Sequence, residues 1–296
     1  MNNSLNFFVD YQDYEVFSIL TQTDSTKLLI VQKKSAPSKK YLLKIFDFEC
    51  CFAKDQKIIL DTFYQISNKK NQYILSYKHF SFSYGSKLTP AISMKYISSK
   101  TLENALNTSN IFLTWKITNI MDCLFAVAEG MNYLHNHLIY HGNLCPSNII
   151  IDEADQFYIC DFGLYPIKKQ YIDSMKIFND DYKDPYMSNN EPTFKNDIYS
   201  FGVLMCNLFH TYYQMRNNQQ KETLREFLLN TNRNKYNKFP RFCSALIPAC
   251  LNSFVSERPS FKQILDLFKS TEYDDEELSI PRLYDKFTKS NYLTKL

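Results

Sequence analysis

The stretch that decides the fold lies between residues 141 and 163. It begins with His-Gly-Asn-Leu-Cys-Pro-Ser-Asn at residues 141–148 and ends with Asp-Phe-Gly at residues 161–163. The order and spacing of these two motifs are specific enough to indicate both a fold and a candidate active site.

Both motifs resemble those of the protein-kinase superfamily. There the catalytic loop reads His-Arg-Asp-Leu, three residues and Asn, and the next strand leads into Asp-Phe-Gly. The resemblance implies that Asn143 stands at the catalytic Asp position and that Gly142 replaces the preceding Arg. It also places Cys145 at a position usually held by Lys. Asn148 and Asp161 match the two magnesium-holding positions.

The first third of the chain has the pattern of a small sheet with one helix. Residues 14–20, 27–34 and 39–46 are rich in β-branched and aromatic residues and are separated by polar turns. Apolar residues at helical spacing predict a helix over 52–66, and 72–97 is strand-like again.

A long apolar helix follows from about residue 113, and helices continue to about residue 270. We therefore predict an α+β, bilobal protein-kinase-like fold. Its small β-rich N-lobe carries one αC helix, and its larger C-lobe is mainly helical. The predicted kinase-like domain covers 14–268, divided into an N-lobe at 14–95 and a C-lobe at 96–268. Residues 1–13 form an N-terminal extension and 269–296 a charged C-terminal tail.

Two later segments support the resemblance and favour its tyrosine-kinase-like group. Residues 195–202 resemble the family's Asp-x-Trp-Ser-Phe-Gly segment, and residues 257–261 carry an Arg-Pro motif. In the family this Arg meets an acidic residue that closes the activation segment. We expect Glu191 to pair with Arg258.

The resemblance also assigns the nucleotide-binding positions of the N-lobe. Lys44 matches the strand lysine that holds phosphates, and Lys40 is its less suitable rival. Leu42 and Met94 fall among the positions around the adenine, and alternation puts Leu42 on the same strand face as Lys44. Gln56 falls where the αC helix should supply a Glu. From that helix we expect Leu60 to pack with His141 and Phe162.

Several catalytic parts differ from those of the family. An Asn143 amide cannot accept a proton at neutral pH, and Cys145 removes a cation near the phosphates. The turn at 21–26 has no glycine to let backbone amides approach a phosphate. Because Gly142 replaces the Arg that would receive a phosphate, we expect the activation-segment residues Tyr165, Tyr171, Ser174 and Tyr182 to be ordinary loop residues rather than switches. Mg-ATP binding is left open, since Asn148 and Asp161 favour it while the turn and Leu42 oppose it.

Composition excludes some other classes of function. The net charge of +3 is too small for a nucleic-acid-binding signature. Lysine pairs, the one at 168–169 among them, are scattered and fit a solvated surface. The longest apolar run, 201–209, is too short to span a bilayer. No export signal is apparent, so we expect a cytoplasmic domain with reduced cysteines.

We therefore expect a pseudokinase that serves as a binding scaffold or allosteric partner in signalling. Its partner would be a protein, such as another kinase or that kinase's substrate. Two alternatives remain: a divergent but active Ser/Thr or Tyr kinase that uses Mg-ATP, and a sensor that binds ATP without transferring phosphate.

Overall fold

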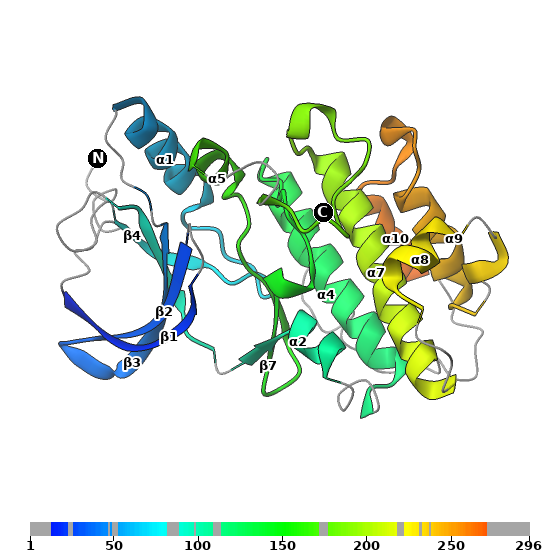
Figure 1. Cartoon of the computed structure of the whole chain (residues 1–296), viewed down its shortest axis with the longest axis horizontal. Coiled ribbons are helices and arrows are strands. Elements are labelled where there is room, and N and C mark those ends of the chain that lie inside the picture. The colour runs from blue at the N-terminus through cyan, green and yellow to red at the C-terminus, as the bar shows by residue number, and fades with distance from the viewer. Residues whose placement is uncertain are drawn as a thin grey trace.

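The computed structural model shows a sheet-containing lobe beside a helical lobe (Figure 1). It describes residues 13–22, 26–46, 48, 53–81, 89–97, 99–108, 114–171, 177–217, 222–230, 233–236 and 238–270. The α+β class and the bilobal arrangement predicted from the sequence are confirmed. The turn residues 23–25, Ser174, the tail from residue 271 and the first twelve residues lie outside the described part.

The N-lobe is an antiparallel five-stranded sheet of order β1-β2-β3-β5-β4. Its strands are β1 (Tyr14–Gln22), β2 (Thr26–Lys33), β3 (Ala36–Phe46), β4 (Tyr77–Ser81) and β5 (Ala91–Lys95). Side chains alternate between its faces. Leu43 of β3 belongs to a small cluster on one face, whereas Leu42 belongs to the main core shared with the C-lobe.

Helix α1 (Ala53–Ile66) lies where the αC helix was predicted. It buries Ile59, Phe63 and Ile66, which recur at helical spacing. Leu60 is 43% exposed, so the prediction that it packs with Phe162 was wrong. The register of the helix turns Ile59 and Phe63 inward instead. The end of α1 lies against Gly163, where a Cβ would come within 2.6 Å of the Ile66 side chain.

The C-lobe is built around two long helices, α4 (Ile117–Asn136) and α7 (Phe194–Asn217). Helix α10 (Phe261–Ser270) packs on α4, and α9 (Arg241–Cys250) packs on α7. The shorter helices are α2 (Leu102–Asn107), α5 (Tyr165–Tyr171) and α8 (Leu224–Leu229). None of the described helices is long and apolar enough to cross a membrane.

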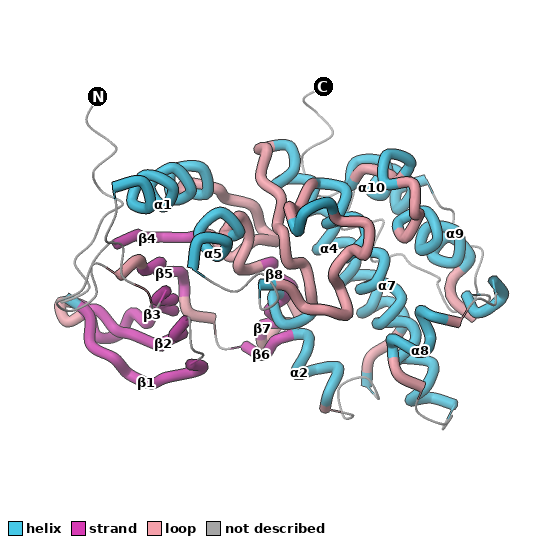
Figure 2. Tube along the Cα trace, turned by 45° about the horizontal axis from the view of Figure 1, so that its top comes forward, coloured by secondary structure: helices cyan, strands magenta, loops and turns pink. Residues whose placement is uncertain are grey.

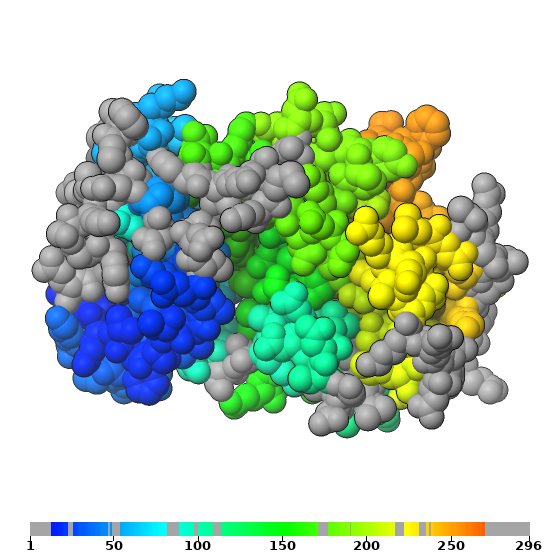
Figure 3. Space-filling view, viewed as in Figure 1, coloured from blue at the N-terminus to red at the C-terminus, as the bar shows by residue number. Residues whose placement is uncertain are grey.

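A small sheet lies between the two lobes and carries both sequence motifs. It has the order β6-β7-β8, with β6 at Ser99–Thr101, β7 at Ile149–Asp152 and β8 at Phe157–Ile159. The tube view places it beside α4 (Figure 2). The strands β7 and β8 therefore hold residues 141–148 and 161–163 at the junction of the lobes. In Figure 3 the N-lobe, in blue, and the C-lobe, in green to orange, lie next to each other.

Candidate active site

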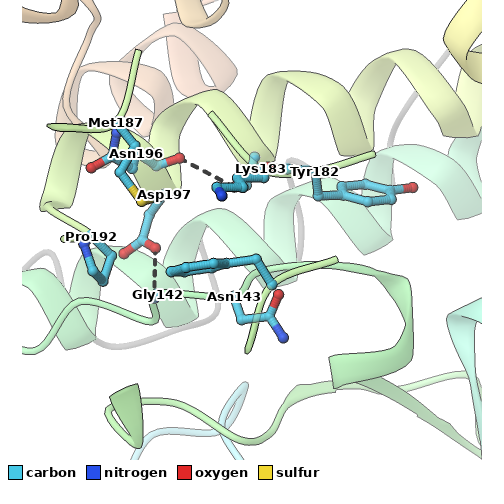
Figure 4. Close-up of a pocket in the computed structure, with 10 residues that line it drawn as sticks. Gly142, Asn143, Tyr182, Lys183, Met187, Pro192, Asn196 and Asp197 are labelled. Carbon is cyan, nitrogen blue, oxygen red and sulfur yellow. Dashed lines mark hydrogen bonds between the residues drawn. The ribbon is translucent and has the colours of Figure 1, made fainter. Parts of the chain in front are cut away.

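The start of the catalytic loop is held by a buried carboxylate of α7. Asp197 accepts hydrogen bonds from the backbone N–H groups of His141 at 2.8 Å and of Gly142 at 2.9 Å. The Nε2 atom of His135 lies 2.9 Å from the same carboxylate. These contacts fix the start of the loop, and the contact between Asp197 and Gly142 is visible in Figure 4. His141 is buried, which lowers the pKa of its imidazole and favours the neutral ring.

Asn143, at the catalytic Asp position, is engaged with the activation segment. Its side-chain oxygen accepts a hydrogen bond from the backbone N–H of Asn179 at 3.0 Å. The side-chain NH₂ of Asn148 donates to the Asn143 carbonyl at 2.8 Å, so the loop is closed on itself. An amide in this position can orient a donor but cannot take its proton.

Cys145 supplies no charge to the site. Its side chain is fully buried, with Sγ 3.1 Å from the hydroxyl of Ser147. Burial raises the pKa of the Cys145 thiol above its ordinary value, so the thiol is neutral. A neutral thiol cannot replace the lysine cation that the family places near the phosphates.

Asp161 lies between two lysines. Lys44 of β3 pairs with Oδ1, and Lys168 of α5 donates to Oδ2 at 2.6 Å. Burial alone would raise the pKa of the Asp161 carboxyl, but Lys168 and Lys44 hold this pKa well below its ordinary value. The prediction that Lys168 belongs to a solvated surface was wrong, since it is only 8% exposed.

This arrangement does not fit a magnesium ion. Mg²⁺ needs a carboxylate oxygen and demands near-octahedral geometry, yet both Asp161 oxygens already hold ammonium groups. The misfit lies at Asp161 and not at Asn148, whose amide nitrogen donates within the loop, whereas a metal would bind the amide oxygen. Among the described residues there is also no cluster of three His, Cys, Asp or Glu side chains suited to a metal.

Leu42 and Met94, the other two predicted nucleotide-site residues, lie opposite each other in the sheet. They are register partners on β3 and β5, and Leu42 also faces Ile30 on β2. Leu42 is 8% exposed and Met94 is 4% exposed, both within the main core. Apolar side chains therefore fill the sheet face next to Lys44.

The predicted pair of Glu191 and Arg258 is wrong. Arg258 forms a fully buried ion pair with Asp184, with its Nη2 atom 3.1 Å from Asp184 Oδ1. Glu191 pairs at the surface with Lys169 of α5. In Asp184-Pro185 the acidic residue comes before Pro, whereas in the family's Pro-Glu it comes after Pro. This acid beside a Pro is a sequence signal that could have identified Asp184 as the partner of Arg258.

The activation segment folds back onto the catalytic loop. Tyr165, Ile177 and Phe178 form a buried cluster with Tyr140 and Met187 packed against it. Tyr182 is buried, and its hydroxyl accepts a hydrogen bond from Asn207 at 2.6 Å. These positions make Tyr165 and Tyr182 packing residues in this conformation.

A pocket lies between the catalytic loop, the activation segment and α7 (Figure 4). Gly142 and Asn143 of the catalytic loop, Tyr182 of the activation segment and Asp197 of α7 are among the residues that line it. The amide of Asn143 thus lies at the edge of this small pocket.

Comparisons with known proteins agree with the fold. The family described as "Protein tyrosine and serine/threonine kinase" matches residues 27–268. The chain is 26% identical over 188 residues to "Probable serine/threonine-protein kinase drkD" of Dictyostelium discoideum, covering 61% of the chain and 14% of that protein. It is 32% identical over 149 residues to "Mitogen-activated protein kinase kinase kinase dlk-1" of Caenorhabditis briggsae, covering 48% and 17%.

A third relative is the mouse "Megakaryocyte-associated tyrosine-protein kinase", which is 26% identical over 179 residues. That match covers 59% of this chain and 35% of the mouse protein. The chain thus spans well under half the length of each of these three relatives.

Proposed function

Because this chain belongs to the protein tyrosine and serine/threonine kinase family, we propose that it is a kinase domain that binds protein partners without transferring phosphate. The observation that carries this proposal is Asn143. It stands at the general-base position, and its amide oxygen accepts a hydrogen bond from the backbone of the activation segment.

The expected loss of rate is large. A missing general base slows a reaction about 10²–10⁴-fold, which is roughly 3–5 kcal/mol of barrier. The neutral Cys145 and the two lysines on Asp161 add to this loss, since phosphoryl transfer depends on placing cations around the phosphates. Several parts of the transfer machinery are altered together.

The partner that we propose is a protein, namely another kinase or its substrate. The support is the fold, which this chain shares with relatives that are named as kinases. A kinase fold that no longer transfers phosphate still has the surfaces with which it can bind other proteins. Its function would then be binding. The cytoplasmic location remains a prediction.

The alternative of a divergent active kinase has its own support in Lys44, Asn148 and Asp161, which are all of the family's residue type. The same three residues support the alternative of an ATP-binding sensor. Phosphate transfer separates the first alternative from our proposal, and ATP binding without transfer identifies the second.

A transfer assay with Mg-ATP and a pool of peptides tests the proposal. We expect no transfer above background from the parent protein. Asn143→Asp should not create robust activity, because Cys145 and the lysine-paired Asp161 remain. The control variant is Asp161→Ala, and autophosphorylation of the parent that disappears in this variant would refute the proposal.

A further inference from the structure

We propose that Lys168 is a built-in replacement for the divalent cation at Asp161 and that it keeps Mg²⁺ from this carboxylate. The inference deepens the proposed function, on which it rests, because a carboxylate held by Lys168 would not hold the metal that phosphate transfer needs. It concerns a residue of the activation segment to which the catalytic-loop motifs assign no role.

The contact is short and buried. The Lys168 ammonium donates to Asp161 Oδ2 at 2.6 Å, and Lys44 holds Oδ1. The side chains of Lys168 and Asp161 are each 10% exposed. A lysine is seldom buried unless it is paired, and the Asp161 carboxylate is the partner that compensates the burial of this ammonium group.

The position of Lys168 is set by a packed helix. Helix α5 lies side by side with α1 (Figures 1 and 2). Ile167, the residue before Lys168, is fully buried in the main core. On the outer side of the helix, Lys169 pairs with Glu191. The two adjacent lysines thus lie in different environments: Lys168 contacts the buried Asp161 carboxylate, and Lys169 is about half exposed to solvent.

The charge balance opposes a metal. Lys44 and Lys168 together exceed the single charge of Asp161, so the cluster carries one net positive charge. A divalent cation brought to the same carboxylate would be repelled by two ammonium groups in a poorly solvated site. Gln56 and Asn143 are uncharged residues where the resemblance to the family places acids, so neither supplies a further carboxylate. Removing the Lys168 amine should therefore convert Asp161 into a metal ligand.

The experiment measures Mn²⁺ binding to the whole chain without nucleotide, by electron paramagnetic resonance of free Mn²⁺, in three variants and the parent. Lys168→Met removes the charge and keeps an unbranched side chain. Lys169→Met is the matched control on the exposed side of the same helix. The double variant Lys168→Met with Asp161→Asn removes the expected ligand.

We expect Lys168→Met to bind Mn²⁺ about tenfold or more tightly than the parent, the change typical of losing an adjacent like charge. Lys169→Met should match the parent, and the double variant should lose the gain. Melting temperatures in EDTA and in excess Mg²⁺ supply a second readout, and Mg²⁺ should raise only that of Lys168→Met.

Equal Mn²⁺ affinity in the parent and in Lys168→Met would overturn the inference, and so would a gain that survives in the double variant. If Lys168→Met fails to fold, Lys168→Gln takes its place, since its amide can still donate to Asp161 without a charge. Phosphate transfer by the parent would refute the proposed function alone, because Mn²⁺ binding is measured without ATP.

Discussion

Two buried aspartates of this protein, Asp161 in the cleft and Asp184 in the helical lobe, lie against basic side chains of different kinds. Asp184 receives a guanidinium whose other N–H groups are also used: Arg258 Nε donates to the Asn252 carbonyl at 2.9 Å and Nη1 to the Lys195 carbonyl at 3.0 Å. Asp161 receives two ammonium groups, one from β3 and one from α5.

The difference separates a structural ion pair from a site built to hold a cation. Arginine presents a planar fork that matches a carboxylate, and here backbone carbonyls also hold it in place. Lysine is a point charge on a flexible stem, so another cation can compete for the same oxygen. We expect substitutions around Asp184 to change stability, and substitutions around Asp161 to change what the cleft binds.

The largest expected effect is that of Arg258→Ala. It leaves Asp184 buried without its cation, and such a loss destabilises by about 3–5 kcal/mol. Urea unfolding measures the change, with the exposed Arg225→Ala as the matched control. A free energy of unfolding within about 0.5 kcal/mol of the parent for Arg258→Ala would contradict the structural role of the pair.

A smaller effect is expected from Leu42→Ala in the cleft. Truncating this leucine should destabilise by about 2–3 kcal/mol, near the low end for buried Leu→Ala, because Leu42 keeps 8% of its surface exposed. The added space should also raise Mg-ATP affinity about 5- to 150-fold if crowding at Leu42 limits binding.

Calorimetry and thermal shift measure both properties of Leu42→Ala. The control is Leu43→Ala, which truncates a neighbouring leucine on the opposite face of the same strand. Tight ATP binding by the parent would defeat the steric explanation. An equal gain in Leu43→Ala would show that loosening of the lobe, rather than space beside Lys44, is responsible.

The smallest effect is expected from Glu191→Ala. Its pair with Lys169 is about half exposed, and exposed pairs contribute about 0.2–1 kcal/mol. The decrease in the free energy of unfolding should lie within this range, far below the decrease expected for Arg258→Ala. A loss as large as that of Arg258→Ala would restore Glu191 as the acid that closes the activation segment.

Much of the fold could be predicted because its signals are local. Strands predicted at 14–20, 27–34 and 39–46 are found as β1, β2 and β3, and the helix predicted at 52–66 is α1. Alternation and helical spacing depend on nearest neighbours along the chain. Leu60 shows the limit, since a rotation of one residue along a helix exchanges the buried for the exposed face.

The sequence by itself determined the bilobal fold and the residue types of the catalytic loop, because both follow from motifs at fixed spacing. Only the tertiary structure decided the partner of each buried charge. Lys44 and Asp161 are 117 positions apart, and Asp184 and Arg258 are 74 apart. Lys168 looks in sequence like its exposed neighbour Lys169, and the packing of α5 against α1 buries one and leaves the other in solvent. A charge is matched by whichever group the fold brings within a few ångströms, and spacing along the chain does not specify that group.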